Sequence, residues 1–579
     1  MSPKLNQYAL ESQLKSWIEH DPDPVTRQHL INLLNRSDSL AIEKLFSSRI
    51  QFGTAGLRGK LGPGPNRMNQ LTVRRLATGL AQYLGAGSKV VLGRDARHKS
   101  KDFLEDIAAV LTANDINVII FPEVIPTPLL AFSVRHLKTD MGIMVTASHN
   151  PSTDNGCKVY MHDGAQLRAP IDEEIDKLIL ESEFPSINLP LGNGTRFTAD
   201  ESLEEAYCAA ITNSLTQQNQ NIRIAYTPLH GVAMGLTQKS FIKARAGELI
   251  PVKTQMTPDA DFPTVSFPNP EEHGVMDSVM NLAKASNADL ALANDPDGDR
   301  LAVAIPTISG EWRLLSGDEI GALLFNHIAS RTSGGNRKVV TTIVCSKLVS
   351  KIAIKHGVEH ATTLTGFKWI IPTAYKDSSS QPIFCYEEAL GYATNTAVRD
   401  KDGISAALMM AELTAELKAK GQTLEDKLND LSLEYGHHVT KTWRVRFNSE
   451  KPSEIIPKVM EDLRVKPLTV INNMKVLEVK DYLSHDNGTG LPSTDLIVIN
   501  IENNVRISIR PSGTEPMIKL YMEIVLPVAK REELPEASGQ AQALLEKIGI
   551  SHENQFKEIL GLNRFFQIVY LQHHLNQEQ

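Results

Sequence analysis

Three aspartates alternate within five residues of the segment ANDPDGDRLAV, where they are Asp295, Asp297 and Asp299. Apolar runs that predict strands flank this segment on both sides. Carboxylates crowded so closely repel one another unless a cation lies among them, and oxygen ligands suit a hard cation such as Mg²⁺ or Ca²⁺. A calcium EF-hand is excluded, because its required glycine and glutamate would be Arg300 and Pro306. A solvated acidic turn is the remaining alternative.

A second polar segment, VTASHNPSTDNGCKVY, covers residues 145–160 and reads as a loop between two strands. A dication held by three carboxylates still accepts an anionic oxygen, commonly from a phosphate, which draws attention to the hydroxyl of Ser148. His149 is expected to point away from Ser148, because neighbouring side chains of an extended segment lie on opposite sides. The segment contains no GxSxG nucleophile elbow. A turn built from Ser, Asn, Pro and Gly is the alternative interpretation.

A third segment, RISIRPSGTEPMIKLYM, has a polar turn between two predicted strands. The turn contains Arg510, Ser512, Gly513 and Thr514, which we call the phosphate loop. A guanidinium fork, two hydroxyls and a flexible backbone rich in N–H groups are suited to binding a phosphate dianion. The alternative is an ordinary hairpin turn of Pro, Ser and Gly.

A fourth segment, FCYEEALGYA, places Glu387 and Glu388 after an apolar strand and before a glycine. Adjacent acids on a turn are commonly just solvated. A carboxylate can also accept two hydrogen bonds from neighbouring sugar hydroxyls. Taken alone, this segment leaves both interpretations open.

The elements that must position these loops alternate between apolar runs and amphipathic stretches. This alternation predicts an α/β fold with parallel or mixed sheets. Near the start, Asp23 and Pro24 are expected to begin a helix as its N-cap and first helical residue. A polar stretch at residues 213–223 reads as a linker, and the strand-like segments from about residue 436 onwards predict a small α+β domain.

Bulk properties narrow the class of protein. The chain has 579 residues, which at about 150 residues per domain corresponds to roughly four domains. A formal net charge of −8 gives no general attraction to nucleic acid or to acidic membranes, so neither is an expected partner. The sequence has no apolar run of about 18 residues and no signal-peptide core. Its four cysteines are scattered, without a CxxC pair, which predicts a cytoplasmic protein with reduced thiols.

Taken together, the four loops resemble the α-D-phosphohexomutase superfamily of phosphoglucomutases and phosphomannomutases. The segments TASHNP, DPDGDR, EEALG and RPSGTEP occur in the order typical of that superfamily, and the resemblance spans about residues 50 to 525. The segments GTAGLRG, YTPLHGV, FPNPEE and TGFKWI are most similar to one branch. That branch contains the longer bacterial phosphoglucomutases and the phosphopentomutase-like proteins.

The resemblance implies a heart-shaped arrangement of four domains, three of them α/β with mixed sheets and the last an α+β domain like the TATA-binding protein. The expected boundaries are an N-terminal helical extension at 1–50, domain I at 51–215, domain II at 216–315, domain III at 316–435 and domain IV with a C-terminal tail at 436–579.

The resemblance also implies a role for each loop. Ser148 would be the phosphorylated residue, and it would hold Mg²⁺ together with the three aspartates. The other residues implied in catalysis are Lys158 as general acid or base, His149, Arg58 and Arg300. The residues implied in binding the sugar and its second phosphate are Thr365, Gly366, Lys368, Glu387, Ala389, Arg510, Ser512, Gly513 and Thr514. Ala389 stands where the phosphoglucomutase pattern has serine, so one hydroxyl that reads the sugar is missing.

The implied activity is that of an isomerase, which interconverts glucose 1-phosphate and glucose 6-phosphate through a phosphoserine and a bisphosphate intermediate. Phosphomannomutase or phosphopentomutase activity is an alternative as the main or a side reaction. Glucose 1,6-bisphosphate is the expected activator, a small phosphosugar the expected partner, and a monomer or weak dimer the expected assembly. A phosphatase that uses a metal and a phosphoserine, or a non-catalytic binding protein, would not need the whole set of loops.

Overall fold

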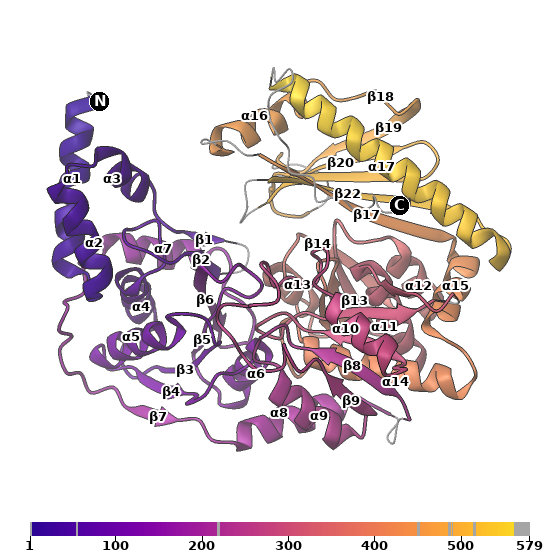
Figure 1. Ribbon diagram of the computed structural model, residues 1–579, viewed down its shortest axis with the longest axis horizontal. Helices are drawn as coiled ribbons and strands as arrows, with labels where there is room; N and C mark the ends of the chain where they lie inside the picture. Colours follow the sequence, from indigo (N-terminus) through magenta and orange to yellow (C-terminus); the bar gives the residue numbers. More distant parts are fainter. Residues whose placement is uncertain are drawn as a thin grey trace. The chain divides into compact units, whose positions relative to one another are not determined.

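The computed structural model describes residues 3–53, 56–216, 221–307, 309–447, 452–484, 488, 490–512 and 517–560. The chain divides into two compact units, which are described separately. Unit 1 comprises residues 1–314 and 391–415, and unit 2 comprises residues 315–390 and 416–579. Figure 1 shows both units and labels most of their helices and strands.

Unit 1 begins with three helices: α1 (Pro3–His20), α2 (Pro24–Asn35) and α3 (Ser39–Phe46). The predicted helix start is confirmed, because the Asp23 carboxylate accepts a hydrogen bond of 2.9 Å from the Val25 amide and Pro24 is the first residue of α2. The three helices share a small apolar core around Leu14, Trp17 and Leu30.

The first sheet of unit 1 contains seven strands in the order β1-β2-β6-β5-β3-β4-β7. Their bounds are β1 Phe52–Gly53, β2 Gly56–Lys60, β3 Lys89–Arg94, β4 Asn117–Ile120, β5 Met141–Val145, β6 Asp154–Met161 and β7 Arg196–Thr198. The helices that follow in this part of the chain are α4 Gln70–Leu84, α5 Ser100–Ala113, α6 Thr127–His136 and α7 Ile171–Glu181. β5 is parallel to β3 and antiparallel to β6, so the sheet is mixed. The turn from β5 to β6, residues 146–153, carries Ser148, and we call it the serine loop.

The second sheet of unit 1 has the order β12-β11-β10-β8-β9. Its bounds are β8 Arg223–Thr227, β9 Glu248–Pro251, β10 Leu290–Ala293, β11 Ala302–Pro306 and β12 Trp312–Leu314, with helices α8 Ser202–Thr212, α9 Met234–Ala244 and α10 Asp277–Ala285. β10 pairs with β11 in antiparallel register, and the acidic segment is the turn between them. The prediction that strands flank this segment is therefore confirmed. Unit 1 also contains β16 (Gly391–Ala393) and most of α14 (Gly403–Ala419).

Unit 2 contains a sheet in which β13 lies between β14 and β15 and is parallel to both. The bounds are β13 Arg337–Thr342, β14 Glu359–Thr363 and β15 Gln381–Glu387, with helices α11 Gly317–Arg331, α12 Leu348–His356, α13 Phe367–Ala374 and α15 Leu424–Tyr435. Because the carboxyl ends of parallel strands meet at one edge, the loops after β14 and β15 emerge together.

The C-terminal part of unit 2 is a sheet of six strands in the order β17-β22-β21-β20-β19-β18, paired antiparallel throughout. The bounds are β17 His437–Arg446, β18 Val470–Ile471, β19 Met474–Asp481, β20 Ile497–Ile501, β21 Val505–Pro511 and β22 Met517–Leu526. Two helices accompany it, α16 Pro452–Val465 and α17 Leu534–Ile559, together with the short 3-10 helix η1 Arg531–Glu533. The predicted class, three α/β parts with mixed sheets followed by an α+β part, is confirmed. Among the described residues, no helix is both long and apolar enough to cross a membrane.

Candidate active site

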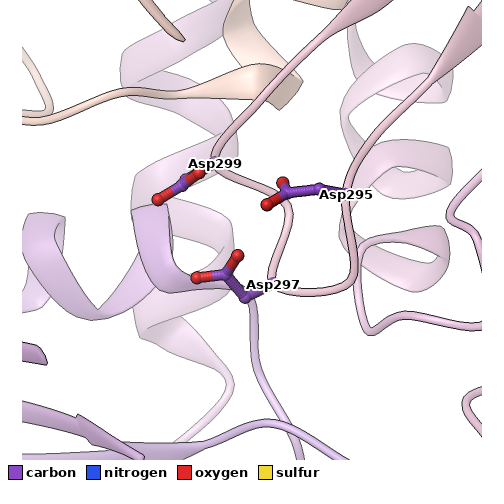
Figure 2. A group of neighbouring side chains, drawn as sticks. All are labelled: Asp295, Asp297 and Asp299. Carbon is purple, nitrogen blue, oxygen red and sulfur yellow. The ribbon is translucent and has the colours of Figure 1, made fainter. Parts of the chain in front are cut away.

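The three aspartates of the β10–β11 turn face one another in unit 1. We call Asp295, Asp297 and Asp299 the acidic cluster; all three are fully buried, and one oxygen from each lies within 4.8 Å of the others. Figure 2 shows their carboxylates converging from the turn. Gly298, with a φ of 75°, lets the chain reverse tightly enough to bring alternate side chains to one point. The two-residue spacing of the aspartates therefore brings their carboxylates to one point, as a metal site requires.

Two lysines neutralise part of this charge. Lys158, on β6, places its Nζ atom 2.6 Å from Asp297 Oδ2 and 2.5 Å from Asp299 Oδ2, and its side chain is almost fully buried. Lys401 lies 3.3 Å from Asp299 Oδ2 through its own Nζ atom. A buried charge is tolerated only when it is paired, so these contacts explain how three carboxylates share one buried turn.

The donor set of the acidic cluster fits a hard cation. Asp297 Oδ1 and Asp299 Oδ1 are buried without a hydrogen-bond partner. Buried carboxylate oxygens normally have a partner, so these two atoms are available as metal ligands. An all-oxygen set of this kind suits Mg²⁺ or Ca²⁺.

The environment separates the pKa values of two of these acids. Burial, followed by the charges of Asp297 and Asp299, raises the pKa of Asp295 to about 8. Burial also acts to raise the pKa of Asp297, but the charge and hydrogen bond of Lys158 outweigh it and hold that pKa below its usual value. The turn therefore has one carboxyl that gains a proton readily and one that stays ionised.

The serine loop brings Ser148 against the acidic cluster. Its Oγ donates a hydrogen bond of 2.7 Å to Asp295 Oδ2, and its backbone amide donates one of 2.9 Å to Thr146 Oγ1. Ser148 has a φ of 52°, a left-handed conformation that is uncommon outside glycine and is often found at functional sites. The side chain is buried, with 1% of its surface exposed.

The position of His149 differs from the expectation. We predicted that it would point away from Ser148, whereas its Nδ1 atom lies 3.2 Å from Ser148 Oγ. The prediction assumed an extended backbone, and the left-handed conformation of Ser148 breaks the alternation of side chains. The ring of His149 also packs edge-on against Phe267, with the ring centroids 6.0 Å apart.

Two arginines lie in the same region of unit 1. Arg58, on β2, feels the charges of Asp297 and Asp299; burial lowers its pKa and these two carboxylates raise it. Arg300 donates its backbone amide to Asp295 Oδ1 over 3.0 Å, and its Nη1 atom lies 3.9 Å from a Glu271 carboxylate oxygen. Both arginines therefore place positive charge beside the acidic cluster.

Three further side chains of this site were not singled out from the sequence. Lys401 pairs with Asp299, as described above. Thr127, the first residue of α6, donates a hydrogen bond of 2.5 Å from Oγ1 to Asp297 Oδ2. Arg97, after β3, binds the backbone of the serine loop. The sequence signal for two of them is a charged turn, GRDAR for Arg97 and RDKDG for Lys401, whereas Thr127 has none.

The sugar-binding candidates belong to unit 2. Thr365 and Gly366 lie in the turn between β14 and α13, and Lys368 is near the start of α13 with its ammonium over the ring of Trp369. Glu387 is the last residue of β15, and Ala389 lies two residues further along the chain. Since β14 and β15 flank β13 in parallel, these residues gather at the same edge of the sheet.

Glu388 is buried under this edge rather than solvated. Its Oε2 atom accepts a hydrogen bond of 3.1 Å from Thr342 Oγ1 and lies 3.8 Å from Cys345 Sγ. Burial, and then the charges of Glu387 and Asp318, raise its pKa to about 7, against a smaller opposite effect of Arg510. The positive charge of Arg510, in the phosphate loop, therefore acts on a carboxylate at the sugar-binding edge, and both residues belong to unit 2.

Half of the phosphate loop lies within the described residues. Arg510 is on β21 and pairs in register with Lys519, and the Ser512 amide donates a hydrogen bond of 2.9 Å to Met517 O. Gly513 and Thr514 lie outside the described residues. The candidates of unit 1 are thus a group around the acidic cluster, and those of unit 2 a group around the carboxyl ends of β14 and β15.

Comparison with known proteins matches four successive segments of the chain. Residues 49–186, 205–310 and 316–435 match alpha/beta/alpha domains I, II and III of phosphoglucomutase/phosphomannomutase, and residues 457–537 match the C-terminal domain. The chain belongs to the phosphoglucomutase/phosphomannomutase family. This confirms the resemblance to the α-D-phosphohexomutase superfamily and identifies the chain as a mutase, an isomerase.

Three relatives are similar to this chain over most of its length. A probable phosphomannomutase of Haemophilus influenzae is 37% identical over 79% of the chain and 93% of its own length. A human phosphopentomutase is 34% identical over 90% of the chain and 92% of its own length. A phosphoglucomutase of Staphylococcus aureus is 33% identical over 88% of the chain and 95% of its own length. The three names differ in the sugar, while the chemistry of a phosphosugar mutase is common to all.

Proposed function

We propose that the protein interconverts glucose 1-phosphate and glucose 6-phosphate through a phosphorylated Ser148 and a sugar bisphosphate intermediate. The observation that carries the proposal is the 2.7 Å hydrogen bond from Ser148 Oγ to Asp295 Oδ2, within a buried acidic cluster. A hydroxyl at that distance can carry a phosphoryl group whose oxygens share a metal ion with the carboxylates. Membership of a mutase family supports the same reading.

The metal proposed for this site is Mg²⁺, on which the family depends. The acidic cluster and a phosphoryl oxygen on Ser148 would hold it, and the two unpartnered oxygens of Asp297 and Asp299 favour this set. When bound, Mg²⁺ supplies charge neutralisation for the transferring phosphoryl group. Arg58 and Arg300 would add to that neutralisation from the protein.

The transfer itself needs in-line positioning more than covalent chemistry. In the first half-reaction the bond between phosphorus and Ser148 Oγ breaks while a bond forms to the free hydroxyl of the sugar phosphate. Lys158 is the residue proposed to accept the proton that this hydroxyl loses, which it does as the neutral amine after its ammonium has passed a proton to a carboxylate that it contacts. His149 lies beside the serine oxygen that receives negative charge. In the second half-reaction the other phosphate of the bisphosphate passes to Ser148, and the proton returns.

The residues of unit 2 are proposed to hold the part of the substrate that does not react. Glu387 and Ala389 would face the sugar hydroxyls, with Thr365, Gly366 and Lys368 beside them. Arg510, Ser512, Gly513 and Thr514 would hold the distal phosphate. Because the bisphosphate has to bind in two orientations, this loop must recognise either phosphate in the same way, which a guanidinium and backbone amides can do.

A pentose phosphate is the second candidate substrate. Two observations favour it: the 34% identity to a human phosphopentomutase over 90% of the chain, and an alanine at position 389, which offers no hydroxyl to the sugar. A site that lacks one hydrogen-bonding group discriminates less against a sugar that lacks the matching hydroxyl. Mannose 1-phosphate is a third substrate to test, given the relative from Haemophilus influenzae.

The test is ³¹P NMR of the purified protein with Mg²⁺, a trace of glucose 1,6-bisphosphate as activator, and glucose, mannose or ribose 1-phosphate in parallel. Appearance of the 6-phosphate or 5-phosphate supports the mutase, and the largest kcat/KM identifies the substrate. Intact-mass analysis of the protein should show one added phosphoryl group that is absent from Ser148→Ala. Release of inorganic phosphate alone would contradict the proposal and indicate hydrolysis, and unchanged spectra would indicate binding without catalysis.

A further inference from the structure

The backbone of the serine loop converges on one buried guanidinium. Arg97 lies in the turn after β3, and 4% of its surface is exposed. Its Nη2 atom donates to Ser148 O and Asn150 O, each over 2.5 Å. Its Nη1 atom donates to Pro151 O over 2.7 Å and Asp154 O over 3.2 Å. One side chain therefore satisfies four carbonyl groups, three in the serine loop and one at the start of β6.

A second residue fixes the orientation of this guanidinium. Asp95 Oδ1 accepts the backbone amide of Arg97 over 3.0 Å and the hydroxyl of Ser100 over 2.6 Å. Its other oxygen lies 3.4 Å from Arg97 Nε. The Asp95 amide in turn donates to Val145 O at the end of β5, where the serine loop begins. The guanidinium also lies over the ring of Phe262, with its central carbon 4.9 Å from the ring centroid.

The type of side chain matters here. Four carbonyl dipoles that point to one place repel each other unless a cation separates them, and an ammonium has three donors on a single atom. A guanidinium offers a planar fork whose two terminal nitrogens can each serve two acceptors. The loop is therefore built around arginine, and lysine at this position would leave part of it unsatisfied.

The backbone that Arg97 holds includes the residue that carries the serine oxygen. Ser148 has a φ of 52°, and its own carbonyl is one of the four groups that Arg97 holds. On the other side of the same residue, Oγ meets Asp295 Oδ2 at 2.7 Å. A residue in this sparsely populated conformation persists only where its surroundings over-determine it. Among the described residues, the hydrogen bonds that the Arg97 guanidinium donates go to the serine loop and to Asp154 at the start of β6, and none reaches the acidic cluster.

We infer that Arg97, oriented by Asp95, is a positioning residue that holds the serine loop in the conformation in which Ser148 Oγ faces the acidic cluster during phosphoryl transfer. The inference rests on the proposed function, since it concerns the alignment of the same hydroxyl. Arg97 acts through the backbone of Ser148, so its loss should affect the transfer step more than substrate binding.

The experiment compares Arg97→Lys, Arg97→Ala and Asp95→Asn with the matched control Arg74→Ala. Arg74 is a partly buried arginine with an ion pair to Asp106 and a hydrogen bond to Ile187 O, and these partners lie outside the serine loop. Each variant is assayed below its own melting temperature for kcat and KM of the sugar phosphate. The rate at which glucose 1,6-bisphosphate phosphorylates Ser148 is followed by intact mass.

Misplacement of a reacting group by about 1 Å can cost roughly 100-fold in rate. We therefore expect kcat and the phosphorylation rate of Arg97→Lys to fall by about that factor, with a much smaller change in KM. Methylguanidine at a non-denaturing concentration should restore part of the rate of Arg97→Ala and none of that of Arg97→Lys. Arg74→Ala should lose thermal stability and keep kcat.

Three results would decide against the inference. If Arg97→Lys melts at a lower temperature but keeps the kcat of the wild type, the residue only stabilises the fold. If KM rises while the phosphorylation rate is unchanged, Arg97 affects binding instead. If the wild-type protein itself acquires no phosphate on Ser148, the proposed function fails and the inference fails with it. Should Arg97→Ala not fold, Arg97→Lys and Asp95→Asn decide on the same criteria.

Discussion

The ammonium nitrogen of Lys158 lies 2.6 Å from Asp297 Oδ2, and both side chains are almost completely shielded from solvent. The same nitrogen contacts Asp299. Lys158 therefore binds two of the three carboxylates that are proposed as metal ligands. A dication in the acidic cluster and the ammonium of Lys158 would therefore compete for the same carboxylates, and this competition can be measured.

Replacing Lys158 by methionine should make the protein more dependent on the metal. In the presence of EDTA, the variant should melt at a lower temperature than the wild type, because two buried carboxylates lose their partner. Addition of Mg²⁺ should raise its melting temperature by more than it raises that of the wild type. Loss of the acid or base function should also reduce kcat by roughly 10²- to 10⁴-fold. The control is Lys89→Met, at the exposed first residue of β3. An equal or smaller Mg²⁺ effect in Lys158→Met would contradict the competition.

Removal of the hydroxyl in Ser148→Ala should abolish mutase turnover. We expect a loss greater than about 10⁴-fold, above the usual effect of removing an acid or base, because the covalent route disappears. The measurement is ³¹P NMR with the preferred sugar 1-phosphate. Ser133→Ala is a suitable control, since the hydroxyl of that buried serine donates to Leu129 O within α6. Substantial turnover by Ser148→Ala would show that the phosphoryl group travels by another route.

Neutralising one ligand in Asp299→Asn should weaken Mg²⁺ binding. Changes around a metal commonly cost 10- to 100-fold in affinity even outside the ligands themselves, so loss of a carboxylate should cost at least about tenfold. Titration calorimetry or the Mg²⁺ dependence of the melting temperature gives the affinity. Asp289→Asn, just before the start of β10, changes the charge equally and should leave the affinity intact. Unaltered Mg²⁺ binding by Asp299→Asn would remove this residue from the metal site.

Stability should depend on pH through Glu388. Its pKa is raised from an ordinary value of 4.5 to about 7, mainly by burial, so between these values the folded protein binds more protons than the unfolded chain. The free energy of unfolding should therefore fall as the pH rises through that window, by at most about 3 kcal/mol from this residue. Urea unfolding of Glu388→Gln should show a flatter profile than the wild type. The control is Glu536→Gln, an exposed glutamate of α17, which should retain the slope.

The substitution Ala389→Ser should improve discrimination between hexose and pentose substrates. One added hydrogen bond is worth about 1 kcal/mol, which corresponds to a roughly fivefold change in kcat/KM. We expect the ratio of kcat/KM for glucose 1-phosphate to that for ribose 1-phosphate to rise by about this factor, because the new hydroxyl has a hexose partner. Competition assays with both sugars give the ratio directly. A fall in kcat/KM by the same factor for both sugars would mean that residue 389 does not read the sugar.

The parts of the site that could be predicted from the sequence are those whose functional residues lie close together in one short segment. Asp295, Asp297 and Asp299 converge because a two-residue spacing and Gly298 suffice to bring them together. The strands around them were predictable for the same local reason, since apolar runs of four or five residues bound the turn. The serine loop follows a fully buried strand, β5, which is equally clear in the sequence.

The parts that were not predictable depend on contacts distant in sequence. Lys401 contacts Asp299 although about one hundred residues separate them in the sequence, and the RDKDG segment gives no indication of this partner. Helix α17, with 26 residues, was not predicted, because glycine, serine and histidine interrupt its apolar positions. Packing of its apolar residues on the C-terminal sheet stabilises the helix, and the sequence does not show that contact. The orientation of His149 required the φ of Ser148, which tertiary contacts determine.

Ser148 is shielded from the surface, since 1% of it is exposed and its loop is bound to a buried arginine. A protein kinase needs its acceptor segment to leave the fold and lie extended in another enzyme. This serine is held too firmly for that, so signalling enzymes are poorly suited to change its state. Under the proposed function, the phosphate content of Ser148 should follow the supply of small sugar bisphosphates and not the activity of protein kinases.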